Sequence, residues 1–297
     1  MTTASFSTRV RHDSDATYQE WRDEFITKLA TLSTYLTADE TNITPGAGAR
    51  PGVSTEGGYA VYHFNDSLHS TFPIYIRFGF GTQSTATHPR IQVTTGTSTN
   101  GSGVLGGTCL STIASINGSA TQVTDTGRQS YMCGHNGFLG INWKTAAAAS
   151  EGFLFVCRTC DNAGAITSTG YSVTWGIGAI GTVTKTQCFR TAATAVAYGS
   201  RTVAAETGWG FFPQNQSATT SGADIQACLG WCWTPNVEPL FGVCGVLDSE
   251  VATGNTFSTT LVGSSARTYI ALTTICGPFG FETHSGNTVP KYCMLWE

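Results

Sequence analysis

The sequence has little charge, and this shortage limits the classes of protein that it can encode. Only 11% of its 297 residues are charged, whereas an average soluble domain has about 25%. The formal net charge is −4, which provides no broad basic field for nucleic acid. Because 40% of the residues are hydrophobic, the low charge does not indicate disorder. A largely neutral surface repels its own copies weakly and suits a protein held in an assembly.

Long apolar segments are also missing. The N-terminus has no apolar core of signal-peptide length, and no run of about 18 apolar residues occurs in the chain. We therefore expect synthesis in the cytoplasm and no membrane span. In that compartment the 10 cysteines are most simply reduced and buried. Their even number also permits disulfides, which the sequence does not assign.

Motifs for common enzyme chemistries are absent. The sequence has no Gly-x-Ser-x-Gly elbow, no phosphate-binding loop and no His-Glu-x-x-His. Its one Cys-x-x-Cys pair, Cys157 and Cys160, lacks the second pair that a zinc ribbon needs, so we interpret both as structural thiols. His63, His69 and His88 are the best candidates for a metal site, but no acidic cluster accompanies them. We expect no cofactor, no metal and no enzymatic activity.

What the sequence does contain is a long series of short β-branched and aromatic runs. The clearest is Pro73–Phe80, in which apolar and other residues alternate as in a strand with one buried face. The apolar positions are Ile74, Ile76, Phe78 and Phe80. Other predicted strands include Tyr59–Phe64, Arg90–Thr95, Thr121–Thr124, Phe138–Trp143 and Gly152–Thr159. We expect a mainly β protein with a β-sandwich or jelly-roll-like body.

One amphipathic α-helix is predicted before this body, from about Ala16 to Leu36. Asp13-Ser14-Asp15 supplies caps and acidic first-turn residues. The apolar stripe consists of Tyr18, Trp21, Phe25, Leu29, Leu32 and Leu36. Such a stripe packs on the chain's own β-region or docks on a neighbouring subunit. In the second case Tyr18, Trp21, Phe25, Leu29 and Leu32 form an assembly interface.

The composition divides the chain into four parts. Residues 1–44 are a polar N-terminal arm and the helix, and residues 45–57 are a Pro- and Gly-rich linker. Residues 58–180 form the β-sandwich, and residues 181–297 form a second β-rich region, either separate from the first or continuous with it. Within the second region, Gln214–Gly222 is predicted to be a polar loop. If the helix is a docking arm, removing residues 1–44 leaves a soluble β-body.

The stretch Gly58–Ile76 is an aromatic-rich strand that ends in Phe64-Asn65-Asp66 and is followed by a strand led by Pro73. This arrangement resembles a segment of uncharacterised virion structural proteins of tailed bacteriophages. The run Pro89–Gly103 is also similar, as is a Trp-containing helix followed by a Thr-Ala-Asp turn, here Thr37-Ala38-Asp39. The resemblance covers residues 15–107, about a third of the chain.

The resemblance implies a structural component of a phage particle, in the tail, the baseplate or the fibre attachment region, assembled in the host cytoplasm. Its partners would be other virion proteins and copies of itself in a ring or trimer, with a host surface receptor as a further partner. One alternative is a receptor-binding or capsid-decorating protein, favoured by aromatic residues near polar loops. Another is a polysaccharide depolymerase, which needs two carboxylates facing each other across a cleft.

Overall fold

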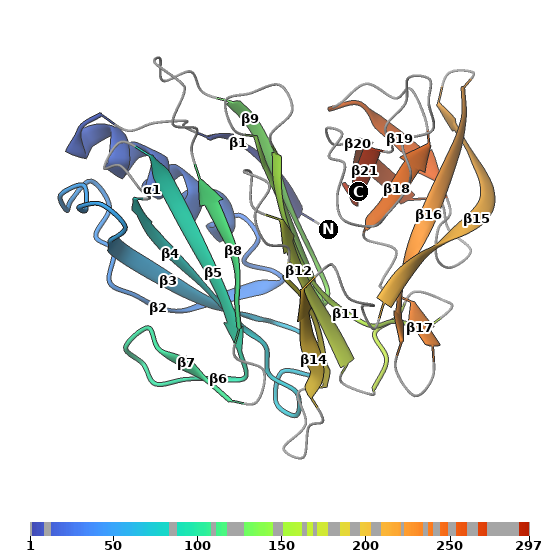
Figure 1. The fold of residues 1–297 in the computed structure, drawn as a ribbon, viewed down its shortest axis with the longest axis horizontal. Coiled ribbons are helices and arrows are strands. Elements are labelled where there is room, and N and C mark those ends of the chain that lie inside the picture. Colours follow the sequence, from blue (N-terminus) through green and yellow to red (C-terminus); the bar gives the residue numbers. More distant parts are fainter. Residues whose placement is uncertain are drawn as a thin grey trace.

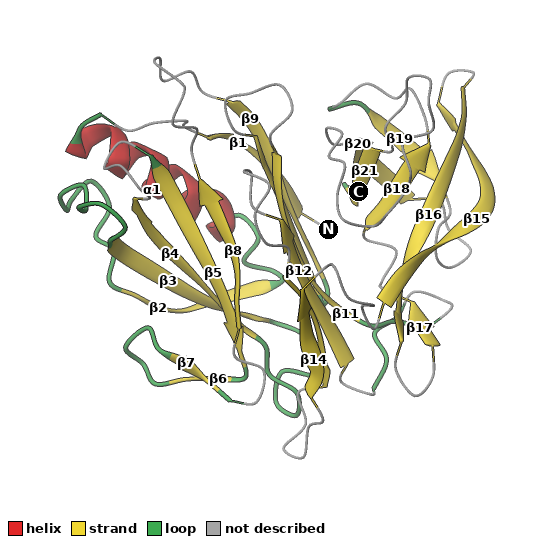
Figure 2. Cartoon of the chain, viewed as in Figure 1, coloured by secondary structure: helices red, strands yellow, loops and turns green. Residues whose placement is uncertain are grey.

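The computed structural model shows three large antiparallel sheets and one α-helix in the part of the chain that it describes (Figures 1 and 2). The described residues are 2–8, 13–82, 88–107, 111–117, 128–144, 151–161, 165–168, 171–177, 185–190, 197–202, 209–220, 223–233, 237–239, 244–248, 254–259, 267–271 and 291–296. The predicted strand run Thr121–Thr124 lies outside them. The expected class, mainly β with one N-terminal helix, is confirmed.

The first sheet has the order β2-β3-β4-β5-β8. Its strands are β2 (Leu36–Thr41), β3 (Glu56–Phe64), β4 (Tyr75–Thr82), β5 (Pro89–Gly96) and β8 (Ser111–Asn117). A short hairpin, β6 (Ser98–Thr99) and β7 (Leu105–Gly106), follows β5. The sequence predictions for β3, β4 and β5 are correct to within three residues at each end.

The central sheet has the order β1-β9-β10-β11-β12-β13-β14 and lies between the other two large sheets (Figure 1). Its strands are β1 (Thr2–Thr8), β9 (Arg128–His135), β10 (Phe138–Lys144), β11 (Glu151–Arg158), β12 (Tyr171–Ile177), β13 (Lys185–Arg190) and β14 (Ala197–Thr202). The predicted boundary after residue 180 falls between β12 and β13, which are paired neighbours in this sheet.

The C-terminal sheet has the order β15-β16-β18-β21-β20-β19, with β17 paired to β16. Its strands are β15 (Trp209–Thr220), β16 (Ala223–Trp233), β17 (Val237–Pro239), β18 (Cys244–Asp248), β19 (Thr256–Thr259), β20 (Arg267–Ala271) and β21 (Lys291–Leu295). Most of the predicted loop Gln214–Gly222 is therefore strand. A register shift in the β15–β16 pairing between Pro213 and Ser217 accommodates its polar residues.

Helix α1 (Asp15–Ala30) begins where the sequence predicts but ends earlier. The Ser14 hydroxyl accepts a hydrogen bond from the Thr17 backbone N–H at 3.2 Å, and Thr17 Oγ1 accepts one from the Ser14 N–H, which makes a reciprocal cap. Residues 31–35 form turns instead of a further helical turn, as expected for a segment rich in the poor helix formers Thr and Ser. Leu32 and Leu36 still reach the core, from the turn and from β2.

The main core lies between α1, the first sheet and the central sheet. The apolar face of β4 packs on the helix, with the Trp21 and Phe80 ring centroids 5.8 Å apart and those of Phe25 and Phe78 5.5 Å apart. The alternation predicted for this strand is confirmed, because its apolar side chains are 0% exposed. The central sheet adds side chains from β9, β10 and β11, namely Met132, Leu139, Ile141, Leu154 and Val156.

The five side chains predicted as an assembly interface are part of this intrachain core. Tyr18, Trp21, Phe25, Leu29 and Leu32 are at most 2% exposed. In this arrangement they offer no surface to a neighbouring subunit, and the interpretation of the stripe as packing on the chain's own β-region fits. Among the described residues, no helix combines the length and the hydrophobicity that a membrane crossing requires.

Two further segments differ from the sequence prediction. Residues 2–8, expected to belong to a polar arm, form β1 and pair with β9 from Thr2 opposite Gly134 to Thr8 opposite Arg128. The stretch Thr37–Asp39, expected to be a turn, lies in β2, where the register shifts between Ala38 and Glu40. Residues 1–44 thus supply two strands and the helix to the fold, so their removal is expected to expose the core.

The helix contact can be tested with one truncation. We expect Phe25→Ala to lower the free energy of unfolding by about 3–5 kcal/mol, because it leaves a cavity beneath two phenylalanine rings of β4. Denaturant unfolding at equilibrium measures the change. The control is Thr27→Ala on the exposed side of the same helix, expected to stay within about 0.5 kcal/mol. Equal effects of the two substitutions would contradict this packing.

Candidate functional site

The outer face of the first sheet, which points away from the core, carries polar and aromatic side chains. Successive side chains of a strand alternate between faces, so this face receives Tyr59 and His63 from β3 and Tyr75 and Arg77 from β4. His63 and Tyr75 are direct cross-strand partners. Two groups of interactions are built on this face, one around the hairpin of residues 97–107 and one around His63.

The hairpin is held on the sheet by Glu40. One carboxylate oxygen accepts a hydrogen bond from the Thr99 hydroxyl, and the other accepts one from the Gly103 N–H at 2.5 Å. Hydrogen bonds to a charged acceptor are roughly twice as strong as neutral ones. Glu40 therefore ties the first arm of the hairpin, at Thr99, and its connecting loop, at Gly103, to β2, which precedes them by about 60 residues.

Arg77 holds the same hairpin from β4. Its Nε donates to the Gly103 carbonyl at 2.7 Å, and its two terminal nitrogens donate to the two carboxylate oxygens of Glu56. The guanidinium also lies 4.9 Å from the centroid of the Tyr59 ring, within the range of a cation–π contact. Gly103 has φ +75°, and a Cβ atom there would lie 2.3 Å from the same ring. Only glycine allows this close approach.

The tip of the hairpin is ordered by its own side chains and presents one apolar residue. Asn100 Oδ1 accepts hydrogen bonds from the backbone N–H groups of Ser102 at 2.9 Å and Val104 at 3.1 Å. The Val104 side chain is 60% exposed. A loop whose backbone is already held in one conformation loses little further entropy when it binds a partner. The hairpin tip is thus suited to binding a partner, with Val104 at the centre of the contact.

The second group is a stack of histidines. His63 Nδ1 lies 2.7 and 2.8 Å from the two carboxylate oxygens of Asp39, a contact in which Nδ1 donates. The His69 ring stacks on His63 with 3.9 Å between ring centroids, and Tyr75 packs edge-on against both rings at 5.7 and 5.8 Å. Burial lowers the pKa of His69, and the neighbouring His63 lowers it further. Burial has the opposite effect on the Tyr75 hydroxyl and raises its pKa.

The structure brings together two of the three histidines considered as metal ligands. His63 and His69 stack, while His88 is a buried residue next to the first residue of β5. Within the described ranges, no group of three His, Cys, Asp or Glu side chains is arranged to hold a metal ion. The stacking and the Asp39 carboxylate orient the two imidazoles relative to each other.

A buried ion pair lies next to the histidines. Asp66, in the loop between β3 and β4, accepts hydrogen bonds from Arg158 Nε at 2.9 Å and Nη2 at 3.1 Å, and both side chains are 0% exposed. The pair joins the first sheet to the end of β11 in the central sheet. Removing one partner of such a pair typically costs about 3–5 kcal/mol, because the other charge stays buried.

Three cysteines whose side chains the structure describes behave as structural thiols. Cys133, Cys157 and Cys160 are at most 1% exposed, and their burial agrees with the sequence prediction. Burial raises the pKa of the Cys133 thiol, which leaves little reactive thiolate at neutral pH. The Cys157-x-x-Cys160 motif therefore contributes to packing at the end of β11.

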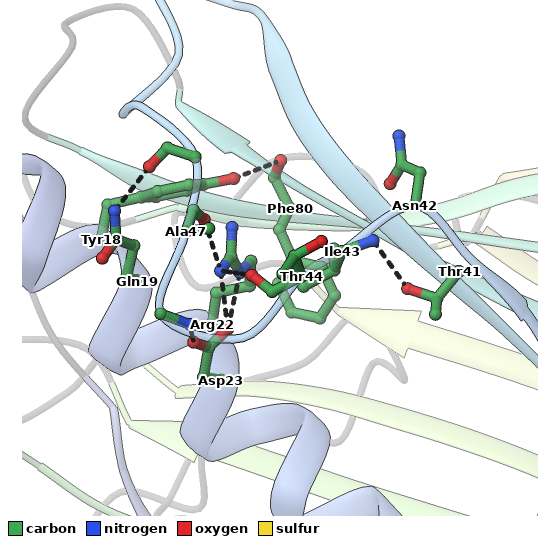
Figure 3. Close-up of polar contacts among 12 residues, drawn as sticks. Tyr18, Gln19, Arg22, Asp23, Thr41, Asn42, Ile43, Thr44, Ala47 and Phe80 are labelled. Carbon is green, nitrogen blue, oxygen red and sulfur yellow. Dashed lines mark hydrogen bonds and ion pairs between the residues drawn. The ribbon is translucent and has the colours of Figure 1, made fainter.

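The predicted linker is bonded to the helix (Figure 3). The buried Arg22 donates from Nη2 to the backbone carbonyls of Thr44 at 3.2 Å and Ala47 at 3.0 Å, and from Nε to Asp23 at 2.8 Å. Asp23 in turn accepts from the Gly46 N–H at 2.6 Å. These bonds make the segment a strap across α1, and they account for a charged side chain that is only 2% exposed.

Sequence reasoning did not single out Glu40, Glu56 or Arg77. Their one signal is the rarity of charge in the β-region, where a charged residue at a strand position calls for a partner. Comparisons with known proteins identify no relative, because no protein family, no curated protein and no solved structure matches the chain.

The role of Glu40 can be tested by substitution. We expect Glu40→Ala to release the hairpin and to speed amide hydrogen exchange of Gly103 by roughly tenfold or more, since one charge-assisted bond is worth about 1.5–3 kcal/mol. Exchange in residues 97–107, followed by NMR, measures the effect. Glu20→Ala, on the exposed surface of α1, is the matched control. Unchanged exchange at Gly103 would mean that Glu40 does not hold the hairpin.

Proposed function

We propose that the chain is a non-enzymatic structural component of a tailed bacteriophage particle, in the tail, the baseplate or the fibre attachment region. We further propose that the hairpin of residues 97–107 is one of its contacts with a neighbouring subunit. The observation that carries this proposal is the hairpin itself: a backbone held by Glu40 and Arg77 with Val104 turned to solvent.

The chemistry of the hairpin fits a permanent contact. Residues 97–107 contain no charged side chain, and the central parts of protein interfaces are depleted of charge. A single exposed valine is common on protein surfaces. A valine on a loop that is bound to a β-sheet through Thr99 and Gly103 is a better anchor, because little flexibility is lost on association. The low overall charge of the chain supports the same interpretation.

The resemblance to virion structural proteins is a second support. It covers residues 15–107, the region that forms α1, the strap, the hairpin and strands β2 to β5 of the first sheet. The Phe64-Asn65-Asp66 motif has a structural role there. Phe64 is 0% exposed, the Asn65 N–H donates to the Tyr35 carbonyl at 2.8 Å, and Asp66 forms the buried pair. The fold therefore explains the Phe64-Asn65-Asp66 motif. The hairpin, in this proposal, serves for contact with a neighbouring subunit.

A receptor-binding or capsid-decorating protein is the second candidate. The first half of the hairpin has the sequence Ser98-Thr99-Asn100-Gly101-Ser102. The Thr99 hydroxyl and Asn100 Oδ1 are bound within the chain, and the remaining hydroxyl and amide N–H groups suit hydrogen bonding to a host surface glycan. Tyr59 and Tyr75 on the same face provide rings of the kind on which sugars pack. In this case the hairpin faces the host instead of another virion protein.

The proposal is tested by the location of the protein and by one charge substitution. Mass spectrometry of purified phage particles is expected to detect the chain in many copies. Val104→Asp is expected to reduce its incorporation at least tenfold, because a buried carboxylate at an interface lacks a partner. Val53→Asp, at the other strongly exposed valine (55%), is the control and is expected to incorporate normally.

The other outcomes decide between the candidates. Normal incorporation of Val104→Asp with impaired adsorption to cells favours receptor binding, and labelling confined to the phage head favours decoration. Turnover of a host glycan by the purified protein would replace the proposal with an enzyme. Absence of the chain from purified particles would refute a virion role. A cryo-EM map of the particle gives the symmetry of the subunits.

A further inference from the structure

The loop between β3 and β4 connects the stack of His63 and His69 on the first sheet with the buried ion pair of Asp66 and Arg158. Its residues 66–72 form a compact turn, in which the Asp66 carbonyl accepts from the His69 N–H at 3.2 Å and the Leu68 carbonyl accepts from the Phe72 N–H at 2.7 Å. Asp66 Oδ1 also accepts from the Leu68 N–H at 3.0 Å. The same carboxylate binds Arg158 of the central sheet. Any tilt of this turn therefore acts on the buried ion pair.

His69 holds the turn against the first sheet through its stack on His63. The His69 Nδ1 atom is buried and has no hydrogen-bond partner, and Arg158 Nη1 is in the same state. The neutral His69 ring is stable in this environment, because it carries no net charge. A protonated His69 ring is disfavoured there, because its centroid would lie 3.9 Å from that of His63 and because the positive charge of Arg158 is close to it.

We propose that the His63–His69 stack is a proton-operated latch: it holds the β3–β4 turn against the first sheet at neutral pH and releases it in mild acid. The Asp39 carboxylate of β2 fixes the His63 ring through Nδ1, so the ring against which His69 stacks is held in place. A proton on His69 puts a charge into this buried stack, and the charged ring leaves it. Release of His69 tilts the turn and strains the pair of Asp66 and Arg158.

The remaining titratable groups offset this repulsion only in part: burial and His63 lower the pKa of His69 more than Asp39 and Asp66 raise it. Tyr75 of β4 is neutral in the relevant range, because burial raises the pKa of its hydroxyl above the ordinary value of 10.0. The nearest carboxylates are Asp39 and Asp66, which bind His63 and Arg158 respectively. Glu40 also acts on Tyr75, but its own carboxylate binds the hairpin. The net effect of these groups is still to keep the pKa of His69 below its ordinary value.

The direction of the pH effect follows from the protonation of His69. Burial lowers the pKa of His69 in the folded chain below its ordinary value of 6.5, so the opened or unfolded state binds the proton more tightly. The stabilisation from the neutral stack is complete above about pH 6.5 and is lost as the pH falls below it. A pKa difference of one unit corresponds to about a tenfold change in the equilibrium between the closed and open turn.

Amide hydrogen exchange of the full chain tests the latch. Protection factors, which correct for intrinsic exchange, are compared at about pH 7.5 and about pH 5.0, on either side of the ordinary histidine pKa. In the wild type we expect residues 66–72 to lose protection severalfold at the lower pH, in the direction set by the lowered pKa of His69. The amides of β10 should keep theirs and serve as the internal reference, because β11 ends in Arg158 and takes part in the proposed coupling. Equal protection of residues 66–72 at both pH values would overturn the proposal.

Substitutions at His69 separate charge from shape. His69→Phe retains a stacking ring that binds no proton, so the turn is expected to stay closed at both pH values. His69→Lys carries a permanent charge and is expected to open the turn at neutral pH. His135→Phe, which removes a stacked histidine on β9, should leave the opening of residues 66–72 unchanged. If the turn of the His69→Phe variant opens in acid as the wild-type turn does, the latch is refuted. If the His69→Lys variant does not fold, the comparison of the wild type at the two pH values decides.

Discussion

The contact between α1 and the inner face of β4 is the constraint on which the described part of this fold depends. Trp21 and Phe25 pack edge-on against the rings of β4, and the end of the helical segment reaches the central sheet through Leu32, which lies against Gly134. Because one face of β4 is filled by the helix, its opposite face is left to carry Tyr75 and Arg77. The outer face of the first sheet is polar at β4 because the apolar inner face of this strand is covered by the helix.

The charged residues around the first sheet act mainly by binding other parts of the same chain. The chain has 15 basic and 19 acidic residues, and in the first sheet and its surroundings many of them bind other parts of the chain. They are Arg22, Asp23, Asp39, Glu40, Glu56, Asp66, Arg77 and Arg158. Most of them hold a loop or a turn that β-pairing does not reach, whereas Asp39 and Glu56 bind the side chains of His63 and Arg77 on neighbouring strands. Surface charge is reduced further as a result, which suits a protein whose surface is covered by neighbours.

Local patterns predicted the regular elements well where burial is one-sided. The period of two in Pro73–Phe80 identified β4 and its buried face, and the possible caps in Asp13-Ser14-Asp15 identified the start of α1. The same method missed β1 and β2, because their polar residues show no alternation and they are held by backbone bonds to β9 and β3. It extended the helix to Leu36, because Leu32 and Leu36 keep helical spacing although they reach the core from a turn and a strand.

The sequence by itself determined the β-rich class, the position of the helix and which side chains of α1 and β4 are apolar, because these follow from short-range periodicity and composition. Only the tertiary structure decided that the stripe of α1 packs within the chain, that the strap binds Arg22, and that Asp66 meets Arg158, 92 residues away. Periodicity shows that a face must be covered, but not by what. Partners distant in the chain meet only when the sheets pack, so no local pattern encodes the hairpin contacts or the histidine stack.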